Sequence, residues 1–126
     1  MRGERTLVVF LIFLMIILGC EGKKISAVPD FLIGVWGTSD PMYADRTFEI
    51  TRGEIIFQTG EKTFDTYTIK GIKVEKVPGE KTPLYVFTYK NIEGLKYKFS
   101  FYYFPGDNES IRFKNQYQIV WTKEGK

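Results

Sequence analysis

Residues Leu95–Phe104 read LKYKFSFYYF, and this stretch decides the fold class. Every second residue from Leu95 to Tyr103 is apolar or aromatic, whereas lysine and serine fill the alternate positions up to Ser100. A period of two is typical of a β-strand with one buried face, because successive side chains of a strand point to opposite sides. The segment Thr82–Lys90 alternates in the same way and ends at a turn, so the two stretches predict a β-hairpin.

The rest of the chain continues this pattern and shows no amphipathic helix. Further strands are expected at Gly34–Trp36, Thr47–Thr51, Glu54–Gln58, Phe64–Val77, Ile111–Lys114 and Tyr117–Thr122, and a single helical turn at Phe31–Ile33. About eight short strands separated by turns favour an antiparallel barrel or sandwich. The alternation reverses at Lys70-Gly71, which predicts a bulge or bend. Closure removes exposed strand edges, so we expect an all-β fold, a small antiparallel up-and-down β-barrel.

Composition excludes several classes of function. The 126 residues allow one domain. The absence of His excludes imidazole bases and histidine metal ligands, and a single Cys excludes an intrachain disulfide or a thiolate metal cage. A net charge of +3 without a polybasic tract argues against a nucleic-acid partner. We therefore expect no enzyme, no cofactor and no metal site.

The N-terminus carries a targeting signal. Arg2 and Arg5 precede Leu7–Leu18, an uninterrupted apolar run within the length of a signal-peptide core but too short to span a bilayer alone. The run ends in Ile17-Leu18-Gly19-Cys20, which resembles the lipobox of bacterial lipoproteins. That resemblance implies removal of residues 1–19 and attachment of acyl chains to Cys20.

The anchor defines the expected organisation of the chain. Residues 20–30 would form a lipid-anchored tether and residues 31–126 the barrel. The protein would lie at the cell membrane or outer membrane, facing the periplasm or the outside, with the membrane as a partner through the acyl chains. Glu21 after the Cys, in place of Asp, favours the outer membrane in lipoproteins of this kind.

Gly34-Val35-Trp36 opens the predicted barrel, and Lys123 follows the last strand. This arrangement resembles that of lipocalin-like (calycin) proteins, in which a G-x-W begins the first strand and a basic residue covers the Trp at the barrel floor. The resemblance implies barrel-floor roles for Gly34 and Trp36, with Lys123 or Arg112 as the cover. Streptavidin-like and OB-type barrels are the alternatives.

Aromatic residues suggest a ligand cavity. If the two central strands face the same side, a wall of rings forms from Tyr85, Phe87, Tyr89, Phe99, Phe101 and Tyr103. Such a wall either lines a cavity for a small apolar ligand or fills the barrel completely, since about eight strands enclose little space. The loop after Trp36 supplies a candidate gate from Asp40, Tyr43 and Arg46.

Two functions remain open on the sequence. A hollow barrel would bind or carry a small apolar ligand in the cell envelope. A solid barrel would bind an envelope protein through its outer face, where Tyr102 and Phe104 lie among polar residues.

Overall fold

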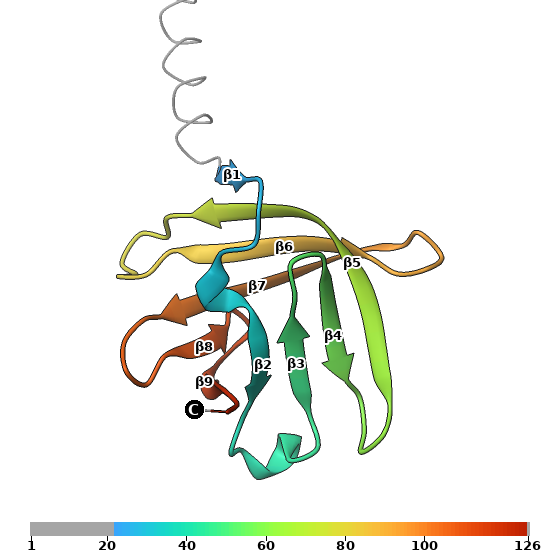
Figure 1. The fold of residues 1–126 in the computed structure, drawn as a ribbon. Helices are drawn as coiled ribbons and strands as arrows, with labels where there is room; N and C mark the ends of the chain where they lie inside the picture. The colour runs from blue at the N-terminus through green and yellow to red at the C-terminus, as the bar shows by residue number, and fades with distance from the viewer. Residues whose placement is uncertain (1–21, 126) are drawn as a thin grey trace, which may run out of the picture.

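The computed structural model describes residues 22–125, which form nine strands and two 3-10 turns (Figure 1). The predicted signal peptide, residues 1–19, and Cys20 lie outside the described residues. The strands are β1 (Lys23–Ile25), β2 (Gly34–Gly37), β3 (Thr47–Ile50), β4 (Glu54–Gln58), β5 (Phe64–Glu75), β6 (Leu84–Lys90), β7 (Lys96–Phe104), β8 (Ser110–Phe113) and β9 (Gln116–Lys123), and the turns are η1 (Asp30–Leu32) and η2 (Pro41–Tyr43).

Eight of these strands close into a barrel. Each strand from β2 to β9 pairs antiparallel with the next one in sequence. The first and last strands then pair with each other, with Trp36 opposite Lys123 and Gly37 opposite Thr122. The predicted small antiparallel up-and-down β-barrel is therefore confirmed, and the element Glu54–Gln58 has the predicted bounds.

The longest strand, β5, bends between two sheet partners. Its first half, Phe64–Thr68, pairs with β4, whereas β6 pairs along Thr68–Glu75 on its other edge. The register with β6 shifts between Ile69 and Gly71, which confirms the bulge predicted where the alternation reverses. The bulge keeps Ile69 and Ile72 facing inward although three positions separate them.

Part of the segment 20–30, which was expected to be a tether, forms a strand on the barrel. Strand β1 pairs with the second half of β5, placing Lys24 opposite Lys73 and Ile25 opposite Ile72. Two features explain the difference: β4 leaves this edge of β5 without a partner, and Ile25 and Val28 are apolar groups that pack onto the barrel core. An unpaired strand edge offers backbone hydrogen-bonding groups to any nearby segment.

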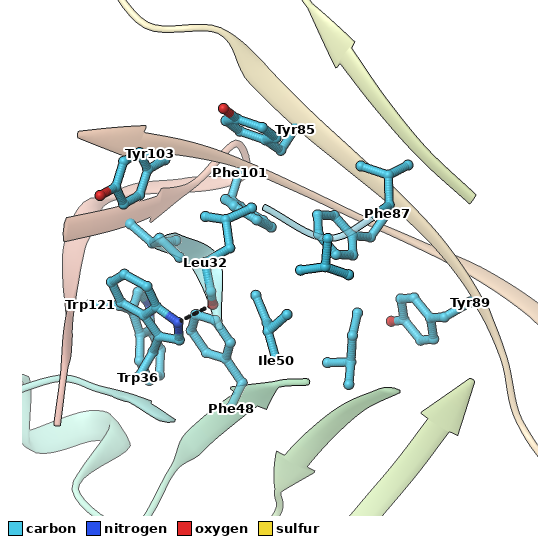
Figure 2. Close-up of a cluster of buried hydrophobic side chains, with 14 of the residues drawn as sticks. Leu32, Trp36, Phe48, Ile50, Tyr85, Phe87, Tyr89, Phe101, Tyr103 and Trp121 are labelled. Atoms are coloured by element: carbon cyan, nitrogen blue, oxygen red, sulfur yellow. Dashed lines mark hydrogen bonds between the residues drawn. The ribbon is translucent and has the colours of Figure 1, made fainter. Parts of the chain in front are cut away.

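The core lies inside the barrel and is closed at one end by η1. Leu32 of this turn is fully buried, and the turn lies within one residue of the predicted helical turn at Phe31–Ile33. We call this the closed end, and the end with the β2–β3 and β6–β7 turns the open end. Figure 2 shows the rings of β2, β3, β6, β7 and β9 converging on the centre.

Candidate functional site

The closed end is built around Trp36. Its ring is fully buried, and its Nε1–H donates a 3.0 Å hydrogen bond to the carbonyl of Leu32 (Figure 2). The Lys123 ammonium lies 5.1 Å from the centre of the ring, within the range of a cation–π contact. Gly34 has φ +146°, and a Cβ there would come within 3.1 Å of the Lys123 side chain. The structure therefore brings Gly34, Trp36 and Lys123 together.

A buried carboxylate completes this end of the barrel. Glu109 is only 7% exposed; its Oε1 lies 3.2 Å from Lys123 Nζ and its Oε2 accepts a 2.6 Å hydrogen bond from Tyr103. Lys123 also donates to the carbonyl of Phe31 at 2.9 Å. Loss of solvent, together with the hydrogen bond to Glu109, raises the pKa of Tyr103 to about 12. The sequence shows Glu109 only as part of a turn, and nothing in its local pattern marks it as buried.

Arg112 lies elsewhere, on the outer face of the barrel. Its guanidinium lies 5.1 Å from the ring centre of Tyr117 and 5.7 Å from that of Phe104. The register of β8 and β9 shifts between Ile111 and Phe113, and Tyr117 is partly exposed beside Arg112 whereas Ile119 is buried. Of the two basic residues considered for the cover, only Lys123 contacts Trp36.

The outer face near Arg112 is a small second core rather than an open apolar patch. Tyr102 is buried, and it clusters with Leu84 and Val86 while Phe104 packs against them. The ring of Tyr117 lies 5.7 Å from that of Tyr102. The apolar residues that the sequence places on a wet face therefore cover one another.

The six aromatic residues of the candidate cavity all belong to the inner cluster. Phe87 and Phe101 are completely buried, with ring centres 5.4 Å apart, and Phe99 lies 5.2 Å from Phe101. Tyr85 stacks on Phe101 at 5.8 Å, and Tyr89 lies nearer the open end. The complete set is Tyr85, Phe87, Tyr89, Phe99, Phe101 and Tyr103.

Rings also fill the space between this wall and the opposite strands. Phe48 of β3 lies 5.4 Å from Phe99, 5.4 Å from Phe113 and 5.3 Å from Trp121. Contacts at these distances leave no room for another flat molecule between the rings. The centre of the barrel is thus crossed by an unbroken series of ring contacts from β3 to β9.

Tyrosines gather at the open end. The ring centres of Tyr67, Tyr89 and Tyr97 lie 5.0–5.7 Å apart, and Phe57 packs against Tyr67 and Tyr89. Burial raises the pKa of Tyr89, and the neighbouring hydroxyls of Tyr67 and Tyr97 raise it further. The pKa of Tyr67 is raised too, mainly by burial, so Tyr67 and Tyr89 stay protonated and can act as hydrogen-bond donors at neutral pH.

The candidate gate is a hydrogen-bonded turn that packs one side chain, Tyr43, against the core. The Asp40 side chain accepts a 2.9 Å hydrogen bond from the Met42 amide and so caps η2. The Tyr43 ring packs 6.1 Å from Trp121, and its hydroxyl accepts a 2.7 Å hydrogen bond from Gln116. Arg46 is exposed, and only its backbone amide is tied to this turn. Tyr43 is thus the one member of the three that reaches the barrel interior.

Hollows occur at the edges of the barrel. One of about 670 Å³ opens beside Phe99 and Phe113, where β7 extends beyond its partner β8. Another, of about 900 Å³, lies along the β5–β6 turn next to β1, and its lining includes Lys23, Lys76 and Lys81. A smaller one of about 400 Å³ adjoins it below Phe31, Tyr85 and Tyr103.

The sheet formed by β1, β5, β6 and β7 carries a cluster of lysines, which we call the lysine face. Register pairs Lys24 with Lys73 and Lys90 with Lys96, so like charges lie directly opposite each other twice. The lysine face consists of Lys24, Lys70, Lys73, Lys90, Lys96 and Lys98. These lysines come from separate segments of the chain, so the sequence contains no basic run that indicates the lysine face. Only the alternation of Lys96 and Lys98 is visible in the sequence.

Residues 22–125 contain neither a membrane-spanning helix nor a cluster of metal ligands. No helix in this part of the chain is long and apolar enough to cross a membrane. No group of three or more acidic, Cys or His side chains within the described range could hold a metal ion. Comparison of the chain with protein-family models, with curated proteins and with solved structures finds no match.

Proposed function

We propose that this protein is a lipid-anchored lipoprotein of the bacterial envelope whose filled barrel acts as a binding module through its outer surface. One observation carries the proposal: fully buried rings in mutual contact occupy the barrel centre, with Phe48, Phe87 and Phe101 at most 1% exposed. A carrier needs a cavity that encloses most of its ligand. A barrel whose interior is filled can bind a partner only at its outer surface.

The lipobox-like sequence supports the anchor. Cys20 is the only cysteine, and strand β1 begins three residues later with Lys23. Two or three acyl chains hold a protein stably on a bilayer, whereas one chain does so only marginally. Incorporation of an alkyne-bearing fatty acid should label the full-length chain, and Cys20→Ala should remove the label.

Lipocalin-like ancestry belongs to the same proposal. The closed eight-stranded meander, the buried Trp36 and the Lys123 side chain above it support such a likeness. In this arrangement the closed end would serve stability, because the Trp–Lys contact ties the first strand to the last.

A small apolar ligand remains a second candidate, because one opening leads toward the interior. The hollow of about 670 Å³ exposes part of Phe99 and Phe113 between β7 and the β8–β9 turn. A flat ligand that displaced Gln116 could stack on these two rings. Lys98 and Lys114 at its rim would favour an acidic group on that ligand.

Titration with an apolar fluorescent probe, N-phenyl-1-naphthylamine, separates the two functions. The filled barrel predicts no saturable signal from the native protein. Phe101→Ala should create a site, because a dry cavity left by a buried ring can take up an aromatic molecule. Saturable one-to-one binding by the native protein, weakened by Phe101→Ala, would contradict the solid barrel and favour the carrier.

A further inference from the structure

We infer that the lysine face, together with the tip of the β6–β7 hairpin, rests on the anionic phospholipid surface of the membrane that holds the anchor. The inference deepens the proposed function and rests on it, because the bilayer would be the ligand of the outer surface. It places the barrel on its side, with β5, β6 and β7 against the bilayer, and the β2–β3 loop away from it.

The positive charge of the lysine face is the first argument for contact with an anionic bilayer. The segments 23–25, 70–75 and 84–98 carry the six residues of the lysine face together with Lys23, against only Glu75 and Glu93. The two ion pairs of residues 22–125 involve Arg52 and Lys123, so no lysine of the lysine face is in an ion pair there. Like charges directly opposite in a sheet are destabilising. An external anionic surface would remove that repulsion at both pairs.

The hairpin tip supplies an apolar point beside these charges. Ile92 is 101% exposed, and Leu95 and Tyr97 are 54% and 41% exposed. The turn is fixed, because the Asn91 side chain accepts hydrogen bonds from the amides of Glu93 and Leu95. Figure 1 shows this hairpin projecting beyond the neighbouring strands. Aliphatic and tyrosine side chains next to lysines are the composition of membrane interfaces.

Chain geometry allows the anchor and the hairpin to reach one surface. At most about 10 Å of extended chain separates Cys20 from Lys23. Lys23 lies opposite Val74, and Val74 lies opposite Tyr85. From Tyr85 the strand β6 runs about 17 Å to Lys90, just before the hairpin tip. The short tether therefore keeps the Lys23 end of β5 and β6 close to the bilayer, and a barrel lying on these strands brings the hairpin tip to the same surface.

The absence of a second cysteine makes the orientation measurable. In the full-length, acylated protein, Ile92→Cys would provide a single free thiol for an environment-sensitive fluorophore. The labelled protein is placed in vesicles of phosphatidylcholine with phosphatidylglycerol and a nitroxide-bearing lipid as quencher. We expect strong quenching at position 92 and little at Met42→Cys in the β2–β3 loop. Lys81→Cys lines the same hollow as Lys23, so it should be quenched in any orientation that the short tether allows.

Charge reversal tests the electrostatic part. Each lysine near an anionic surface contributes about a fivefold preference, so removing two lysine charges should disfavour this orientation by roughly 25-fold. Lys96→Glu with Lys98→Glu also adds two repelled charges, so it should disfavour the orientation by more than that and abolish quenching at position 92. The matched control, Arg46→Glu with Lys62→Glu, reverses two exposed charges away from the face and should leave quenching unchanged. Vesicles of phosphatidylcholine alone should give weak quenching.

The possible failures are distinguishable. Two fluorophores on each Ile92→Cys chain would show that Cys20 carries no acyl group, which overturns the anchor and with it the orientation. One fluorophore without quenching at position 92 overturns the orientation alone. Quenching at Lys81→Cys and not at Ile92→Cys would mean that the closed end faces the bilayer, which also overturns it.

Discussion

Replacing Trp36 by alanine should remove the largest single contribution to the closed end of the barrel. The side chain has no exposed surface, lies with its ring centre 6.3 Å from that of Phe48, and donates a hydrogen bond to Leu32. Truncation of a buried Trp costs about 3–5 kcal/mol of unfolding free energy through lost burial and the cavity left behind. Domains of this size are stable by only ~5–15 kcal/mol, so the variant should be close to unfolding at room temperature.

Two companion variants separate the causes. Trp36→Phe keeps most of the ring but leaves the Leu32 carbonyl without the indole donor, at a cost of about 1–3 kcal/mol. Met42→Ala is the matched control, because this apolar side chain is 79% exposed and should change stability by less than about 0.5 kcal/mol.

The assay is urea unfolding followed by far-ultraviolet circular dichroism, which does not depend on the tryptophan that is removed. The expected order of stability is native protein and Met42→Ala together, then Trp36→Phe, then Trp36→Ala. A loss below about 1 kcal/mol for Trp36→Ala would refute the placement of this ring in a packed floor.

Three further outcomes follow from the same region and its neighbours. Gly34→Ala should cost about 1–3 kcal/mol in urea unfolding, because its φ of +146° is strained for alanine and the new methyl meets Lys123; a neutral effect would contradict this packing. The pKa of Tyr103 is raised from 10.0 to about 12 in the folded protein, so the unfolded chain loses the Tyr103 proton at a lower pH. The free energy of unfolding of the native protein should therefore fall between pH 10 and 12 more steeply than that of Tyr103→Phe. Equal slopes of unfolding free energy against pH would argue against the contact of Tyr103 with Glu109. Tyr102→Lys should lower stability by roughly 1–3 kcal/mol, and an unchanged urea midpoint would show that its outer cluster is not packed.

The fold was predictable because alternation alone specifies strand faces. The stretch from Leu95 to Phe104 assigned its odd positions to one side, and the structure places Phe99, Phe101 and Tyr103 in the inner cluster. Tyr97 stacks on Tyr89 at the open end of the same side and stays partly exposed. The reversal at Gly71 located the bulge for the same reason. Local pattern could not locate β1, because β1 pairs with the part of the β5 edge that β4 does not reach. That free edge is a property of the closed barrel and not of the residues of β1.

The site residues depended on contacts between distant positions, which the sequence does not display. Lys123 and Arg112 are equivalent as basic residues near the C-terminus, and only the β2–β9 pairing sets Lys123 over Trp36. Glu109 is likewise held by side chains of two other strands, Tyr103 of β7 and Lys123 of β9. The shift of register between β8 and β9 turns Tyr117 outward, and a pattern of alternating residues cannot reveal such a shift.

The most direct test of the solid barrel is native mass spectrometry of residues 21–126 taken straight from the cell extract. The filled interior predicts the mass of the bare chain, identical before and after refolding. A reproducible excess of mass that disappears on denaturation would show a bound small molecule. That result would contradict a barrel that acts only through its outer surface.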